Sequence, residues 1–148
     1  MSIIPIEVAM QHVYADEADK EQVQRKLASA IATAEQYMGR RVYATLEDWY
    51  AAKEKAEADI KTIVTPTATS SQDDNNVVMQ LQFGVNQMLF HQSKMAILGV
   101  LMNPAIEAGV LLILGDLYAN RENTVQGGMA ELPMAAKHHL QPFRLIGV

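Results

Sequence analysis

The chain has 148 residues, of which 49% are hydrophobic and 20% charged, and its net charge is −5. This length predicts a single domain over residues 1–148 with a buried core, and this composition excludes a chain that is disordered throughout. The acidic net charge argues against a protein that coats nucleic acid by neutralising phosphates. Because cysteine is absent, disulfides and thiolate metal sites are excluded.

The N-terminal quarter shows the start signals and hydrophobic spacing of two helices. Pro5 favours a short helix that runs to about Val13. Asp19 and Gln22 have the spacing of a capping box, which predicts a second helix. Gly39 suits the left-handed cap at the end of that helix. Its apolar positions recur every three or four residues and predict one buried stripe: Val23, Leu27, Ala30, Ile31, Ala34 and Met38.

A third helix is predicted from the capping pair Thr45 and Asp48 to a point before Pro66. The face of this helix opposite its apolar stripe carries charges of both signs, which is more typical of a solvated face than of a binding site. Residues 65–76 contain no large apolar side chain and are predicted to form a loop, either disordered or ordered on docking. The apolar stripe of the helix comprises Trp49, Ala52, Ala56, Ile60 and Ile63.

Helical spacing continues from Val77 to Met102, and Asn103-Pro104 then starts a further helix that runs to about Asn120. Between Asn75 and Ile106 the sole charged residue is Lys94. A monomer of this size would have difficulty hiding so much uncharged helix, whereas a homo-oligomer would not. We expect no membrane span here, because Asn103-Pro104 and Glu107 divide the apolar run.

The sequence holds no recognisable catalytic or metal-binding motif. His138 and His139 are adjacent, so on a helix they point about 100° apart and cannot easily share a metal. Asp73 and Asp74 lie in the polar segment, where nothing would desolvate them. Gly127-Gly128 indicates a hinge or turn and lacks the Lys of a phosphate-binding loop. We therefore expect a protein that is not an enzyme and has no cofactor or metal.

The segment from Leu114 to Arg144 carries a resemblance to a known family. An apolar helix ends in Tyr118-Ala119-Asn120-Arg121-Glu122, the glycine pair follows, and a Pro-started helix from Leu132-Pro133 ends in Gln141-Pro142-Phe143-Arg144. This order resembles the C-terminal region of the head–tail connector (portal adaptor) proteins of long-tailed phages. The similarity covers Ile4–Arg41 and Pro104–Arg144, whereas residues at about 45–103 depart from the family pattern as an atypical inserted segment.

The resemblance implies an all-α fold: a small helical bundle with a long C-terminal apolar helix and a short docking helix or tail, assembling into a ring. It implies a structural virion protein at the head–tail junction, made in the host cytoplasm, that extends the DNA channel under the portal. Expected partners are further copies in a twelve-fold ring, the portal protein and a neck, stopper or tail-completion protein. Phage DNA would pass through the channel without specific binding.

Family position implies assembly contacts at Tyr118, Asn120, Arg121, Leu132, Pro133, Pro142, Phe143 and Arg144. Two of these residues have alternative interpretations. Arg121 either caps the preceding helix or crosses a subunit boundary, and Arg144 belongs either to a frayed tail or to a docking segment.

Two other functions remain open at the level of sequence. The first is a small helical DNA-binding packaging regulator, whose basic face would comprise Arg25, Lys26, Arg40 and Arg41. The second is an enzyme of an uncharacterised kind or a membrane-associated helical protein, for which no residue pattern gives positive support.

Overall fold

The structure is a computed structural model that describes residues 3–64, 75–120 and 132–145, with only the backbone described for 63–64 and 75–82. These residues are mostly helical, which confirms the all-α class predicted from the sequence. In chain order the elements are α1 (Ile6–Val13), the 3₁₀ turn η1 (Glu17–Asp19), α2 (Lys20–Met38), β1 (Val42–Tyr43), α3 (Leu46–Val64), α4 (Asn75–Ile97), β2 (Val100–Leu101), α5 (Pro104–Ala119), α6 (Met134–Leu140) and the 3₁₀ turn η2 (Gln141–Phe143).

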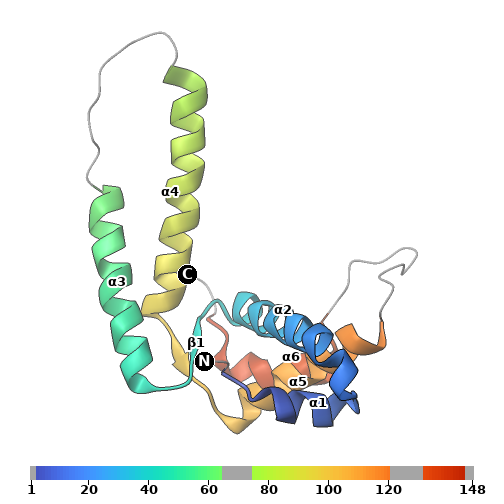
Figure 1. The fold of residues 1–148 in the computed structure, drawn as a ribbon. Helices are drawn as coiled ribbons and strands as arrows, with labels where there is room; N and C mark the ends of the chain where they lie inside the picture. The colour runs from blue at the N-terminus through green and yellow to red at the C-terminus, as the bar shows by residue number, and fades with distance from the viewer. Residues whose placement is uncertain (1–2, 65–74, 121–131, 146–148) are drawn as a thin grey trace.

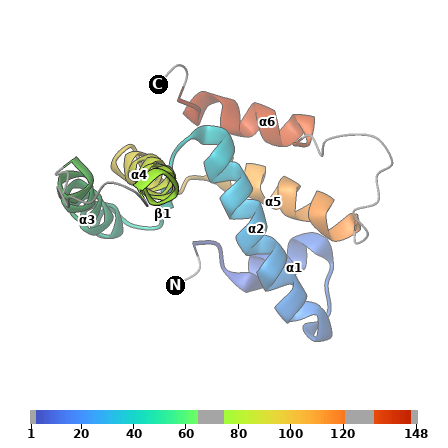
Figure 2. The ribbon, with the colours of Figure 1, turned by 90° about the horizontal axis from the view of Figure 1, so that it is seen from above.

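The helices form two parts (Figure 1). Helices α1, α2, α5 and α6 make a body, in which α5 contacts each of the other three. Helices α3 and α4 pair as a hairpin that projects away from the body, and the view from above separates the two parts clearly (Figure 2). The segment at about 45–103, which the resemblance implies to be an insertion, corresponds closely to this hairpin together with β2.

The core of the body is built from the helical stripes that the sequence predicts. The predicted stripe of α2 is buried except at Ile31, which packs half-buried against the core. The inward side of α5 meets this stripe, and α6 closes the other side of α5. The buried members are Ile4, Ala9, Val23, Leu27, Ala30, Ala34, Met38, Val42, Ile106, Val110, Ile113, Leu114, Ala136 and Leu140.

The predicted helix ends are confirmed at three places. Gly39 takes φ +69° at the end of α2, the left-handed conformation that glycine adopts without strain. At α3 the hydroxyl oxygen of Thr45 accepts from the amide of Asp48 at 3.1 Å. Helix α2 begins directly after Asp19, but the predicted capping hydrogen bond is wrong, because the Asp19 side chain makes none to the helix. Its carboxylate instead accepts from the hydroxyl of Tyr118 at 2.8 Å.

A short parallel strand pair replaces the end of the helix predicted over Val77–Met102. Helix α4 ends at Ile97, and β2 then pairs with β1, with Val42 opposite Val100 and Tyr43 opposite Leu101. The turn passes through Gly99, where an added Cβ would lie 2.6 Å from the Tyr43 ring and 2.8 Å from Trp49 Nε1. The close packing of these two rings therefore requires glycine at the turn.

Among the described residues, no helix combines the length and the apolar character needed to cross a membrane.

Helix α5 depends on the side chain of Asn103 for its start. The Asn103 Oδ1 accepts from the amides of Ala105 and Ile106, both at 3.0 Å. We expect Asn103→Ala to lower the free energy of unfolding by about 0.5–2 kcal/mol, because two amide donors lose their partner. Urea denaturation followed by circular dichroism measures this loss. Asn103→Ser is the matched control, since its hydroxyl also accepts; equal losses for both variants would contradict the capping role.

Candidate assembly surface

The assembly residues expected at the end of α5 have different surroundings. Tyr118 is half-buried, and its hydroxyl holds α5 to the start of α2 through Asp19. Asn120 is exposed and donates from Nδ2 to Asp116 Oδ1 at 3.0 Å. Tyr118 therefore holds the body together, whereas Asn120 lies at the surface.

The residues expected at the start of α6 lie beside the same end of the body. Leu132 packs half-buried against the core, and the carbonyl of Pro133 accepts from the amide of Lys137 at 3.0 Å. Arg121 and the Gly127-Gly128 pair lie outside the described residues, so both alternatives for Arg121 stay predictions.

The final expected residues lie at the opposite end of α6, against the end of α2. Phe143 packs on the core, Pro142 is exposed, and the Arg144 guanidinium lies over the Tyr37 ring at 5.1 Å from its centroid. The Tyr37 hydroxyl donates to Gln141 Oε1 at 2.6 Å, and the amide of Leu145 donates to the carbonyl of Met38 at 3.0 Å. The expected residues thus form two groups at the two ends of the body, and Arg144 stacks over Tyr37.

A buried carboxylate at the base of the hairpin was not predicted from the sequence. Glu35 is 6% exposed; its Oε1 accepts from the amide of Val42 at 2.9 Å and its Oε2 from Arg41 Nη1 at 3.0 Å. At the other side of the base, Trp49 Nε1 donates to the carbonyl of Ala96 at 3.2 Å. The Glu35 contacts tie the end of α2 to β1, and the Trp49 contact ties α3 to α4; the amide of Arg41, which donates to the carbonyl of Met95 at 3.0 Å, joins the two pairs.

Tyr43 lies beside this base. Burial raises the pKa of its phenol above the ordinary value; the charge of Arg41 lowers it and that of Glu35 raises it. The phenol is therefore neutral at physiological pH and packs as an uncharged ring.

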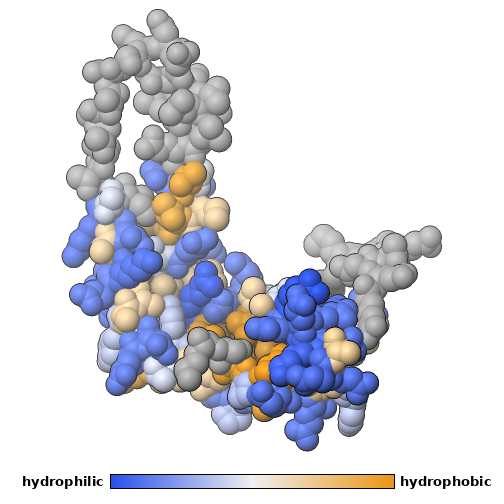
Figure 3. Space-filling model, in the orientation of Figure 1, coloured by the Kyte–Doolittle hydropathy of each residue, from blue (hydrophilic) through white to orange (hydrophobic). Residues whose placement is uncertain are grey.

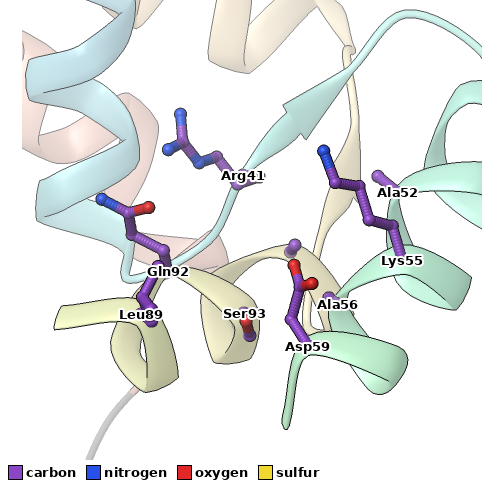
Figure 4. Close-up of a pocket in the computed structure, with 9 residues that line it drawn as sticks. Arg41, Ala52, Lys55, Ala56, Asp59, Leu89, Gln92 and Ser93 are labelled. Atoms are coloured by element: carbon purple, nitrogen blue, oxygen red, sulfur yellow. The ribbon is translucent and has the colours of Figure 1, made fainter. Parts of the chain in front are cut away.

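A shallow opening of about 210 Å³ lies between α3 and α4 near the base (Figure 4). Arg41, Lys55 and Asp59 supply charges of both signs around it, and Leu89 and Gln92 approach it from α4. The full lining is Arg41, Ala52, Lys55, Ala56, Asp59, Leu89, Gln92, Ser93 and Ala96. In the part of the chain that the structure describes, no group of three or more histidine and acidic side chains is placed to hold a metal ion.

The most unusual surface lies on α4. Five large apolar side chains there are between 42% and 66% exposed: Phe83, Val85, Met88, Leu89 and Phe90. Figure 3 shows hydrophobic atoms over α4 below the grey end of the hairpin. The sequence signal was the stretch from Asn75 to Ile106 with Lys94 as its one charge, but Phe83 and Phe90 were not among the expected assembly residues.

The basic residues of the DNA-binding alternative are partly engaged inside the subunit. Lys26 Nζ donates to the carbonyl of Leu117, and Arg41 pairs with the buried Glu35. Arg25 is exposed and Arg40 is half-buried. The predicted basic face therefore offers fewer free cations than the sequence suggests.

Comparisons with protein-family models, with curated proteins and with solved structures gave no match to this chain.

Proposed function

We propose that this chain is a structural head–tail connector of a long-tailed phage, whose copies form a ring under the portal vertex. The ring would extend the DNA channel and present a platform for a neck or tail protein. The observation that carries the proposal is the exposed apolar surface of α4 on a hairpin that projects from the body. The motif order from Leu114 to Arg144 supports it independently.

The size of the α4 surface favours assembly. If a large apolar side chain presents roughly 200 Å² when fully exposed, the five α4 side chains leave on the order of 500 Å² in contact with water. This apolar area, carried by one helix, equals that of the largest single patch on a typical monomer, about 300–600 Å².

The C-terminal segment is the candidate platform. The Arg144 guanidinium lies over the Tyr37 ring, and Pro142, two residues earlier in the chain, is exposed. The planar guanidinium of arginine matches the geometry of a carboxylate and can bind it through two hydrogen bonds. This surface therefore suits an acidic side chain on the portal or on a neck protein.

The charge distribution agrees with a channel through which DNA passes without specific binding. The net charge is −5, and Lys26 and Arg41 are engaged within the subunit. A DNA-packaging regulator would need a free basic face, so it is the less supported function.

Electron microscopy tests the proposal directly. The purified chain is mixed with portal-bearing heads of the phage that encodes it, and the portal vertex is imaged with and without the chain. We expect an additional ring of density under the portal. Absence of this density, together with a monomeric mass by light scattering, would contradict the proposal. Salt-dependent retention of the chain on DNA would instead favour the packaging regulator.

A further inference from the structure

The exposed apolar residues of α4 form two separate flanks. Phe83 and Phe90 are seven residues apart, so they lie on one side of the helix. Val85 and Met88 are three residues apart and share another side. Within each of the pairs Phe83/Val85 and Phe90/Met88 the helix turns by about 200°, which places the two flanks on nearly opposite sides of α4.

A polar strip separates the flanks on the side of α4 away from α3. Gly84, Gln87 and His91 lie there and are exposed, and a Cβ added at Gly84 would contact nothing within 4 Å. On the side toward α3, Ser93 is buried and Leu89 lines the opening between the two helices. The apolar surface is thus two patches, with α3 on one side and water on the other.

Two different patches on opposite sides of one element match the geometry of a closed ring. In a two-fold dimer both copies use the same patch, whereas a head-to-tail interface joins two different patches and gives a ring when the rotation between copies closes. A single partner protein docked on one flank would leave the other exposed to water. A row of identical copies covers both flanks at once. The one charged residue on α4, Lys94, lies one turn beyond Phe90 on the side toward the base of the hairpin, so the apolar pairs themselves are uncharged.

From this geometry we infer that the hairpins of neighbouring copies pack side by side, with the Phe83/Phe90 flank of one copy against the Val85/Met88 flank of the next. The inference rests on the proposed ring and names the surface that closes it. The hairpin, which departs from the family pattern in sequence, is then the wall of the ring.

Cysteine pairing tests this arrangement, because the chain has no cysteine of its own. Phe90→Cys and Met88→Cys are made separately, and each is oxidised alone and as an equimolar mixture, in solution and on portal-bearing heads. We expect disulfide dimers mainly in the mixture, at least fivefold above either variant alone. A chain with both substitutions should give a ladder of higher covalent oligomers. Tyr14→Cys, at a site 95% exposed on the body, is the control and should cross-link with neither.

The cross-linking results separate failure of the head-to-tail pairing from failure of the proposed function. Dimers of Phe90→Cys with itself, or of Met88→Cys with itself, at the level of the mixture would overturn the head-to-tail pairing. Rings on portal-bearing heads without any cross-link would place the interface elsewhere and also overturn it, while the proposed function would stand. Failure of the wild-type chain to associate with itself or with the heads would overturn both.

Discussion

Leu140→Ala is expected to lower the free energy of unfolding by about 2–5 kcal/mol, the usual cost of emptying a fully buried leucine site. Leu140 is fully buried between α6 and α5. Its side chain lies so close to α5 that a Cβ added at Gly109 would be 2.9 Å from Leu140 Cγ and Cδ2. Two helices that approach this closely have little freedom to collapse into the cavity, which favours the upper part of the range.

Urea denaturation followed by circular dichroism measures the effect, with Met134→Ala as the matched control. Met134 belongs to the same helix but is 71% exposed, so its truncation should change stability by less than about 0.5 kcal/mol. We also expect the C-terminal segment of Leu140→Ala to be cleaved faster by trypsin, because Leu140 anchors the turn that carries Arg144. Equal stability of the two variants would contradict the placement of α6 in the core.

The second large effect is expected for Glu35→Ala. This change leaves the amide of Val42 without its acceptor and the Arg41 guanidinium without its carboxylate. An unpaired buried donor costs about 1–3 kcal/mol, and the Arg41 side chain, 45% exposed, adds little because it regains water. We therefore expect a loss of about 1–3 kcal/mol in the free energy of unfolding.

Glu35→Gln separates the two contributions. Its amide oxygen can still accept from Val42, while the charge that pairs with Arg41 is gone, so it should retain most of the stability. Hydrogen exchange at Val42 and Val100 provides a local measurement, since both amides lie at the base of the hairpin. Faster exchange in Glu35→Ala than in Glu35→Gln is the expected result. Unchanged exchange in both variants would show that Glu35 does not hold β1.

The parts of the fold that depend on local sequence were predictable. The α2 stripe, the left-handed Gly39 and the Thr45 cap follow from spacing and residue type within one element. The β1–β2 pair was not predictable, because two residues paired with two others 58 positions away leave no periodic signal. Asp19 shows a similar competition: the spacing of a capping box is present, but a tyrosine 99 residues away takes the carboxylate.

The sequence predicts that an uncharged helical surface needs a partner, but it does not predict which residues form that surface. The scarcity of charge between Asn75 and Ile106 indicated that these helices need partners. Helical spacing alone does not distinguish a face buried within the subunit from one left exposed, so Phe83 and Phe90 were recognised only once α3 was seen to cover a single side of α4. Glu35 was missed because a carboxylate within a helical stripe resembles a solvated position until its partners from β1 are in view.

The most direct test of whether the copies bury the flanks of α4 is to image portal-bearing heads with a variant that carries two substitutions, referred to below as the paired variant. Phe83→Asp combined with Phe90→Asp places charge on one exposed flank without touching the core, so the helical content measured by circular dichroism should match that of the wild-type chain. We predict ring density under the portal for the wild-type chain and for Tyr14→Asp, and none for the paired variant. Ring density of equal strength for the paired variant would contradict the account.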